Sequence, residues 1–340
     1  MKRLPWEYAS LLLLFLALTI YKLFDSTEES QPSAGLINEN EPLKIGLYTF
    51  IGYGPIFVAE KVGFFDSVGL NVAIYKIEGD PERRAALASG QIDVATHTLD
   101  ALVALRTNGL DAQAFLEIDA SLGADGILAD TAIETIVQLK EKSIAYASGT
   151  PSHFFLHQVL DKVGLSMADI ESQIVDSSDK AAQAFISGRV DAAVTWEPWL
   201  TNASKDHGHI LIGSEKRPYL IKDVMYASSK TLSEKQKEIS ALTEAWFLTV
   251  EWIKENPEAA QEIIANEFSI PKEEMNLIFP KVRYQDRTAN RNAFIDRNSP
   301  QSLYNLYKNI SSVWLEERII SKPDSAKNGL YPNYILPPKN

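Results

Sequence analysis

The sequence predicts an α/β protein with two lobes, and three observations carry this prediction. From Leu43 onward, short apolar runs rich in β-branched residues alternate with helix-length segments, the pattern of βαβ units with mainly parallel sheets. A second block of the same kind starts near Gly126. The chain has 340 residues, of which 45% are hydrophobic, so it is long enough for two cores of ordinary domain size.

The first block alternates strictly between the two kinds of element. Its expected strands are KIGLYTF, LNVAIYKIE, IDVATHT and AQAFLEID, and its expected helices are GPIFVAEKVGFF, PERRAALASG and LDALVALRTNG. Together they predict the first part of lobe 1, residues 43–122.

The second block repeats this alternation and predicts lobe 2, residues 123–222. Strands are expected at DGILAD, SIAYASG, SQIVDSS and DAAVTWEP, and helices at TAIETIVQLKEK, PSHFFLHQVLDKVG and DKAAQAFISGR. A further strand, DVMYASS, is expected to return the chain to the first lobe, which then includes residues 223–330.

Helical patterns dominate the last third of the chain. They extend over residues 233–268 and 302–318. Pro257 follows Asn256, and we expect it to separate two helices, because proline disrupts a helix interior. The aromatic stripes of these helices predict core packing.

The N-terminus predicts export. Lys2 and Arg3 precede the uncharged apolar run from Tyr8 to Ile20, whose length of about 20 Å as a helix is short of the roughly 30 Å hydrocarbon core. Residues 1–24 are therefore expected to be a signal peptide or an N-terminal membrane anchor, and the residues leave both alternatives open. Residues 25–42 are polar and acidic and predict a flexible tether. The expected location is the periplasm or the extracytoplasmic face of the inner membrane.

Charge and cysteine content exclude several classes of function. The formal net charge is −12 and no basic stripe is evident, which argues against nucleic-acid binding. Cysteine is absent, so the chain has no disulfides, thiolate metal sites, thiol catalysis or lipobox.

Candidate binding residues follow from the expected strands, because ligands of open α/β sheets gather beyond the carboxyl ends of the strands. Five such ends supply small, hydroxyl-bearing, aromatic and acidic side chains: Tyr48, Thr49 and Tyr53; Thr96, His97 and Thr98; Asp119 and Ser121; Gly149, Thr150, Ser152 and His153; Trp196 and Glu197.

The segment SGTPSH suits an oxyanion best. Glycine permits close approach, Thr150 or Ser152 is placed to cap the helix, and Pro151 fits its first turn. An ordinary capped helix start explains the segment equally well. Asp119 and Glu197 suit either a ligand cation or a capping or ion-pair role, and Trp196 suits either a pocket wall or the core.

Motifs of metal binding and catalysis are weak. His153 and His157 share one helix face, but HFFLH lacks the glutamate of a zinc-protease motif. GxSxG, Walker A and GxGxxG patterns are absent. We therefore expect no metal, no cofactor and no catalytic residue.

A family resemblance covers roughly residues 43–270. The run YGPIFVAEKVGFF through DALVAL, and then GADGILA, GTPSHFFLHQVLDKVGL, AAQAFISGRVDAAVTWEPWL and ENPEAAQEII, resemble in order the nitrate/sulfonate/taurine-type (NMT1/THI5-like) binding proteins of ABC importers. The resemblance implies a type 2 periplasmic-binding fold, with two α/β lobes, a double crossover hinge and a ligand cleft between the lobes. Carried over by position, it places near the cleft Tyr53, Thr98, Asp119, Ser121, Thr150, Ser152, Trp196 and Glu197.

The resemblance also implies a function. The chain is expected to be a monomeric, extracytoplasmic solute-binding protein that closes on a small anionic or zwitterionic solute and delivers it to an ABC permease and ATPase. Members of the family are similar to binders of nitrate, alkanesulfonates, taurine or thiamine-precursor pyrimidines. The candidate residues include no arginine, and Asp119 with Glu197 would suit a zwitterion such as taurine.

Two other classes of protein stay open at this point. One is an enzyme of the same fold, of thiamine-pyrimidine or menaquinone-precursor metabolism. The other is a membrane-tethered sensor that reports ligand occupancy to a partner.

Overall fold

The computed structural model describes residues 41–206 and 208–335. The expected export segment, residues 1–24, and the tether up to residue 40 lie outside the described residues. Across the part of the chain that is described, no helix combines the length and the apolarity needed to span a membrane.

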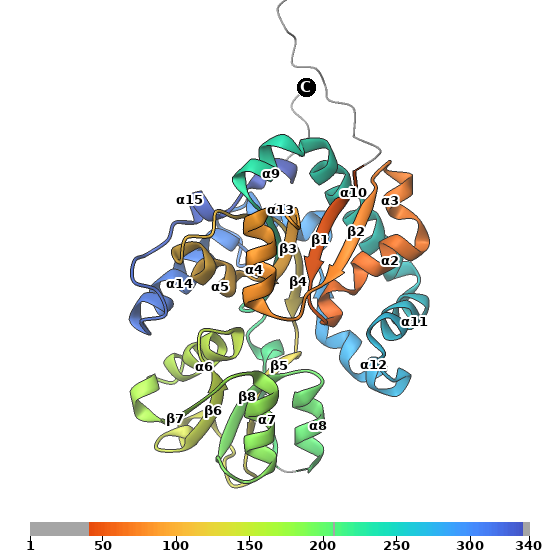
Figure 1. Cartoon of the computed structure of the whole chain (residues 1–340). Coiled ribbons are helices and arrows are strands. Elements are labelled where there is room, and N and C mark those ends of the chain that lie inside the picture. Colours follow the sequence, from red (N-terminus) through yellow and green to blue (C-terminus); the bar gives the residue numbers. More distant parts are fainter. Residues whose placement is uncertain (1–40, 207, 336–340) are drawn as a thin grey trace, which may run out of the picture. The chain divides into compact units, whose positions relative to one another are not determined.

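The first sheet has six strands in the order β11-β4-β10-β3-β1-β2 (Figure 1). They are β1 (Leu43–Leu47), β2 (Val72–Lys76), β3 (Val94–Thr98), β4 (Gln113–Ser121), β10 (Lys222–Ala227) and β11 (Val282–Tyr284). β1 pairs in parallel with both β2 and β3. A right-handed crossover places its helix on one face of the sheet when the chain moves across the strands in one direction, and on the opposite face when it moves back. The chain moves one way from β1 to β2 and the other way from β2 to β3 and on to β4. Accordingly α2 (Gly54–Val62) lies on one face, and α4 (Asp80–Ser89) and α5 (Leu99–Thr107) lie on the other.

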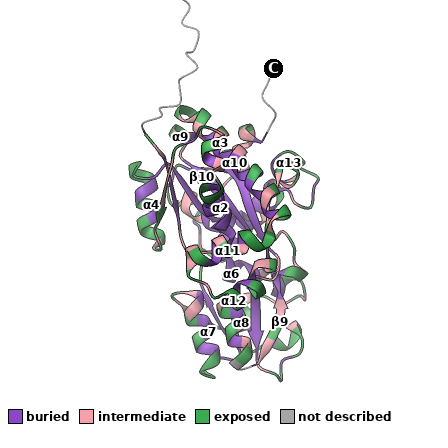
Figure 2. Cartoon of the chain, turned by 90° about the vertical axis from the view of Figure 1, so that its right-hand side faces the viewer, coloured by how far each residue is buried: buried purple, intermediate pink, exposed green. Residues whose placement is uncertain are grey.

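The second sheet has five strands in the order β7-β6-β8-β5-β9. They are β5 (Asp125–Ala129), β6 (Ser143–Ala147), β7 (Glu171–Val175), β8 (Ala192–Trp196) and β9 (His209–Gly213). The helices α6 (Pro151–Asp161) and α7 (Ser178–Ile186) pack against β6 and β8, and α8 (Trp199–Asp206) packs against β5. Strands β3, β5 and β10 are buried along their whole length (Figure 2).

Both sheets are mixed rather than mainly parallel. β10 runs antiparallel to β3 and β4, and β5 runs antiparallel to β8 and β9. The reason is connectivity: β5 and β10 are the first strands after the chain passes from one sheet to the other, so each enters its sheet from the edge at which the neighbouring parallel strands end.

Two crossovers join the sheets, at residues 122–124 and 214–221. They are bonded to each other: the hydroxyls of Ser121 and Ser214 lie 2.6 Å apart, and the Gly123 N–H donates to Ser214 Oγ at 2.7 Å. This arrangement is the double crossover that the resemblance implied.

The remaining helices follow the second crossover or cover the first sheet. They are α3 (Phe64–Ser67), α9 (Ser229–Glu234), α10 (Gln236–Glu255), α11 (Pro257–Phe268), α12 (Lys272–Ile278), α13 (Arg287–Phe294), α14 (Leu303–Glu316) and α15 (Ala326–Gly329). As expected, Pro257 occupies the first turn of α11 and the preceding helix ends at Glu255. α14 packs against both α5 and α6 and so contacts both lobes; its buried Trp314 donates an indole N–H to the Asp100 carbonyl at 2.9 Å.

The helix expected at TAIETIVQLKEK is wrong. Only Ile136–Leu139 is helical, as a 3₁₀ turn. Asp130 accepts the N–H of Ala132, and Gln138 accepts the N–H groups of Glu134 and Thr135, so short polar side chains satisfy the backbone locally instead of a helix.

Candidate functional site

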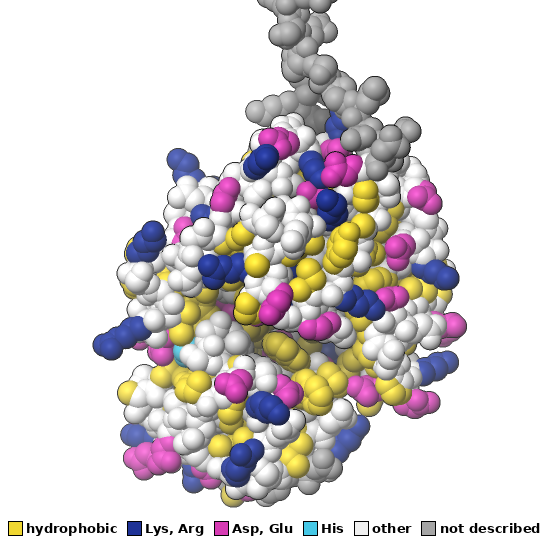
Figure 3. Space-filling view, in the orientation of Figure 1, with side chains coloured by type: hydrophobic (Ala, Val, Ile, Leu, Met, Phe, Trp, Pro, Cys, Tyr) yellow, Lys and Arg dark blue, Asp and Glu magenta, His cyan; other side chains and the backbone are white. Residues whose placement is uncertain are grey.

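A crevice lies where strand ends of the two sheets meet. It is narrow in this structure: its free space is about 10 Å³, room for about one water molecule, so a solute enters only when the two sides move apart. The residues that line and define this crevice come from both lobes: Tyr48, Phe50, Thr98, Asp125, Pro151, Trp196, Ile221 and Asp223. Figure 3 shows hydrophobic side chains gathered at a hollow between the two parts of the molecule, with acidic side chains near its rim.

Aromatic rings form one side of the crevice. Tyr48, directly after β1, packs edge-on against Tyr53 at 5.0 Å between ring centroids, and Phe50 packs on the same Tyr53 at 5.4 Å. The Arg83 guanidinium lies 4.6 Å from the Tyr48 ring centroid. Because Tyr53 is fully buried, it holds in place the half-buried rings of Tyr48 and Phe50.

Lobe 1 contributes a row of polar side chains across four neighbouring strands. In the register of the sheet, Tyr284 is opposite Asp119, Asp119 is opposite Asp223, and Asp223 is opposite Thr98. Directly opposed residues point to the same face of a sheet, so the four side chains lie side by side. The Tyr53 hydroxyl donates to Asp223 Oδ1 at 2.6 Å.

Asp119 is the least satisfied member of this row. Its side chain is 0% exposed, and neither carboxyl oxygen has a hydrogen-bond partner within the described structure. Burial raises its pKa well above the usual value, and the nearby Asp223 raises it further. Burial likewise raises the pKa of Asp223 to about 7.

Lobe 2 contributes a second acidic group. Asp125 opens β5 and stands opposite Trp196, which ends β8, so both side chains face the crevice together. Burial raises the pKa of Asp125 to about 7 against a hydrogen bond from Ser121 that lowers it. Asp100, behind Thr98 in the first turn of α5, is also buried, and burial raises its pKa to about 7.

Basic side chains near the crevice each have an acidic partner of their own. Arg83 binds Asp80, Lys222 Nζ lies 2.9 Å from Glu117, and Lys281 binds Glu197. Among the described residues that line the crevice, none is a lysine or an arginine.

The N-terminus of α6 approaches the crevice from lobe 2. Pro151 is in its first turn, as expected. The expected capping is not seen: Thr150 stands at the cap position, but its hydroxyl donates to the Ala147 carbonyl at 2.7 Å, and no side chain caps the helix. Ser152 is fully buried and its hydroxyl lies 3.2 Å from that of Ser178. The first-turn N–H groups of α6 are therefore left without a side-chain acceptor at the cap position.

The structure brings some of the sequence-predicted site residues to the crevice and not others. Tyr48, Thr98 and Trp196 line it. Tyr53, Thr96, His97, Asp119 and Ser121 are buried around it.

Two predicted residues are engaged elsewhere. The Thr49 hydroxyl is exposed and donates to Glu78 at 2.7 Å. Glu197 accepts from Thr201 and is paired with Lys281, so the ion-pair alternative describes it.

The loop at Gly149 has a structural use. Gly149 has φ +72°, a conformation that favours glycine, and its N–H donates to His153 Nδ1 at 3.2 Å. His153 in turn directs Nε2 toward Glu317 at 3.4 Å, and burial lowers its pKa to about 4.

One group of side chains has the composition of a metal site. His157 on α6 and the residues Glu316 and Glu317 at the end of α14 offer ligand atoms within 4.8 Å of one another. Glu316 is largely exposed, and the individual contacts of His157 Nε2 with the two carboxylates are 3.8 and 3.9 Å. These contacts also join the two lobes.

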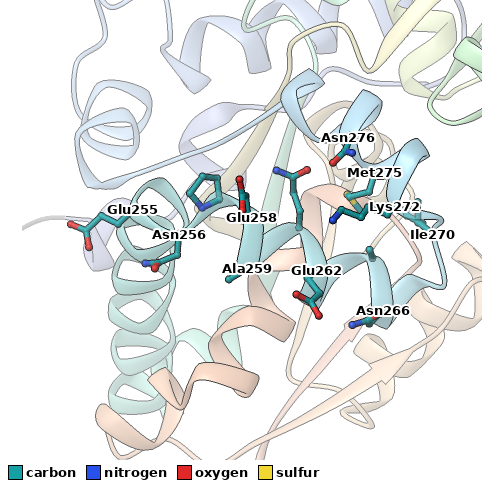
Figure 4. Close-up of a pocket in the computed structure, with 13 residues that line it drawn as sticks. Glu255, Asn256, Glu258, Ala259, Glu262, Asn266, Ile270, Lys272, Met275 and Asn276 are labelled. Atoms are coloured by element: carbon teal, nitrogen blue, oxygen red, sulfur yellow. The ribbon is translucent and has the colours of Figure 1, made fainter.

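A larger hollow of about 1770 Å³, much of it open to solvent, lies among α10, α11 and α12 (Figure 4). Its lining side chains, among them Glu255, Glu258, Glu262 and Lys272, come from the outer helices of lobe 1 alone. It contains none of the strand-end residues and no contribution from lobe 2, so it does not have the geometry of a closing cleft.

The family model described as NMT1/THI5 like matches residues 51–260, more than half of the chain. The chain belongs to this family. Among curated relatives, a putative aliphatic sulfonates-binding protein of Bacillus subtilis is 29% identical over 234 residues, which cover 66% of this chain and 69% of that protein.

Solved structures share the fold of this NMT1/THI5-like chain. The periplasmic aliphatic sulphonate binding protein of Escherichia coli superposes with a TM-score of 0.72 at 18% identity, covering 87% of this chain and 99% of that one. A desulfurization enzyme superposes with a TM-score of 0.61 at 13% identity, covering 86% and 97%. The fold therefore serves both binding proteins and an enzyme.

Proposed function

We propose that this chain is the solute-binding component of an ABC importer, acting as a monomer on the extracytoplasmic side of the membrane, and that it captures a small sulfonate-class solute in the crevice. The observation that carries the proposal is that strand ends of two separate sheets line one crevice beside a double crossover. The name of the Bacillus subtilis relative supports the solute class.

Closure of the lobes is the proposed mechanism. Thr98 and Asp223 from lobe 1 face Asp125 and Trp196 from lobe 2, so a solute between them contacts both lobes at once. Such a solute binds the closed form better than an open one and shifts the population toward closure. The permease and ATPase then recognise the closed form.

The N-terminus of α6 is the proposed contact for the sulfonate. Its uncapped first turn presents N–H groups, and the helix dipole favours a negative group there. Pro151 brings this turn to the crevice.

The side chains at the crevice support a protein that binds its solute without converting it. Thr98 Oγ1 lies 3.3 Å from His97 Nδ1, and His97 Nε2 lies 3.3 Å from Asp80, an order that resembles a nucleophile, a base and its orienting acid. However, His97 Nδ1 already accepts the Thr98 N–H at 2.9 Å, and Asp100 takes a hydrogen bond from the Thr98 hydroxyl. The chain has no cysteine for thiol chemistry.

A thermal-unfolding screen of the full-length chain tests the proposed function. The panel contains short alkanesulfonates, aminosulfonates, nitrate and pyrimidines. A ligand at a hundred times its dissociation constant adds roughly 2.7 kcal/mol, which raises the melting temperature measurably. A hit that is recovered chemically unchanged supports a binding protein. Conversion of the hit to a product would identify an enzyme instead.

A further inference from the structure

Around the crevice, buried carboxyl groups outnumber the basic side chains that could pair with them. Three cations lie nearby, and each is matched by its own carboxylate: Arg83 by Asp80, Lys222 by Glu117, and Lys281 by Glu197. Four more carboxyls, each at most 4% exposed, form no ion pair with any described basic side chain: Asp100, Asp119, Asp125 and Asp223. An uncompensated buried charge costs several kcal/mol, so this excess is not explained by folding.

Placement of these acids points toward the crevice. Asp125 and Asp223 line it from opposite lobes. Asp119 stands beside Asp223 in the sheet register and leaves both carboxyl oxygens without a partner among the described residues. Its side chain is held in place because it packs against the backbone at Gly52, where a Cβ would lie 2.1 Å from Asp119 Oδ2. A fully buried carboxyl whose neighbouring polar group is a second carboxyl, Asp223, belongs to a pair that a ligand cation satisfies.

Aromatic rings complete the arrangement. Tyr48, Phe50 and Trp196 line the same crevice as the two carboxyls. Ring faces attract cations, most strongly when water is excluded. Acids and aromatic rings together favour a protonated amine over an uncharged group.

We propose that the solute carries a positively charged nitrogen, and that Asp125 and Asp223, with Asp119 beside them, bind it between the lobes. This inference rests on the proposed function and narrows its solute class from sulfonates in general to aminated ones. Within the crevice the positive end lies against the carboxyls and the sulfonate end lies at the N-terminus of α6. A sulfonate that lacks the nitrogen brings its negative charge next to the same acids and gains nothing from them.

Matched ligand pairs test the inference on the full-length chain. Calorimetry at pH 8 compares 2-aminoethanesulfonate with 2-hydroxyethanesulfonate, and 3-aminopropanesulfonate with 3-hydroxypropanesulfonate, so that each pair differs only in the cationic group. We expect at least one aminated compound to bind ten-fold or more tightly than its hydroxyl partner. Equal or tighter binding of the hydroxyl compounds overturns the inference and leaves the proposed function standing. No binding of any of the four compounds overturns both for this class of solute.

Variants assign the effect to the carboxyls. Asp125→Asn and Asp223→Asn should each weaken the aminated compound ten-fold or more and change the hydroxyl compound less than two-fold. Asp66→Asn is the control, because Asp66 is exposed on α3 and makes the same change in net charge. Unchanged affinity of the aminated compound for both crevice variants, with their folding verified by circular dichroism, contradicts the inference.

Proton linkage supplies a second measurement that needs no variant. A cation bound beside carboxyls favours their ionised form, so binding at pH 7 should release protons to the buffer. The heat of binding measured in phosphate and in Tris, which differ in ionisation enthalpy, gives the sign. Release is expected, and uptake of protons overturns the inference, because uptake is the response to an anion bound there.

Discussion

At the scale of single residues, the buried carboxyl of Asp119 is expected to lower the stability of the ligand-free protein. Its carboxyl is buried without a partner among the described residues, and burial together with Asp223 raises its pKa. We expect Asp119→Asn to raise the melting temperature of the ligand-free chain at pH 8, by the equivalent of roughly 1–3 kcal/mol, because an amide donates to Asp223 at every pH, whereas the buried carboxyl must bind a proton to do so. The measurement is thermal unfolding followed by circular dichroism.

The ligand separates this effect from ordinary stabilisation. The same variant should show a smaller ligand-induced rise in melting temperature than the wild type, since it removes a group that the solute satisfies. Asp66→Asn should change neither quantity. A fall in the ligand-free melting temperature of the Asp119 variant would show that the native carboxyl is stabilising after all.

Inspection of the sequence found crevice-lining residues where strands end toward the crevice and missed those where strands begin there, and their role in binding stays a prediction. Tyr48 follows β1, and Thr98 and Trp196 end β3 and β8; all three were found by inspecting carboxyl ends. Asp125 and Asp223 were missed because β5 and β10 run antiparallel to their neighbours, so their first residues reach the same edge. In the sequence, only the order of strands within each sheet could have revealed this, and that order depends on long-range pairing.

At the scale of elements, periodicity located most helices and strands between Leu43 and α14. It failed for residues 131–142, where side chains of Asp130 and Gln138 bond the local backbone. Strands β9 and β11 were also not predicted, because each is an edge strand that is only partly buried and is specified by pairing with β5 or β4. The division of the chain into lobes at residues 122 and 222 stays a prediction.

A contact of Lys281 with residues around the start of α8 links the two lobes. Lys281 ends the 3₁₀ helix η5 (Phe279–Lys281) in lobe 1, and its ammonium binds both Glu197 and Thr201 of lobe 2. We expect Lys281→Met to destabilise the chain by about 2 kcal/mol, since the Glu197 side chain is 1% exposed and loses its only cation among the described residues. Denaturant unfolding measures the stability, and X-ray scattering should show a larger radius of gyration.

A surface lysine provides the matched control. Lys254 binds Glu251 and Asp286, but it is about half exposed, so Lys254→Met should cost no more than about 1 kcal/mol and leave the radius of gyration unchanged. The double variant Lys281→Met with Glu197→Gln should recover part of the loss, because it removes the unpaired charge. Equal effects of the two lysine substitutions would argue against the idea that the contacts of Lys281 with Glu197 and Thr201 hold the lobes together.

At the scale of the whole molecule, the excess of buried acid makes stability depend on pH in an unusual direction. Burial raises the pKa values of Asp100, Asp125 and Asp223 to about 7, so the folded state holds protons that the unfolded state has released above about pH 4. Their contribution is fully present below the unfolded pKa and is lost as pH rises through about 7. His153 acts oppositely, since burial lowers its pKa to about 4 and its contribution is lost as pH falls below about 6.5. Of these four groups, only the three carboxyls change the stability above about pH 6.5.

The ligand-free chain should therefore lose stability as pH rises from about 5 to about 7 and level off above about 7.5, because three carboxyls outweigh one histidine. Chemical denaturation at fixed temperature across this range gives the slope, and Asp223→Asn should flatten it. A saturating aminated solute should flatten it too, because a bound cation lowers the pKa values of the same carboxyls and removes the difference in bound protons between the folded and unfolded states. A flat profile in the ligand-free wild type would mean that the crevice carboxyls are neutralised within the protein, and it would remove the electrostatic reason for a cationic solute.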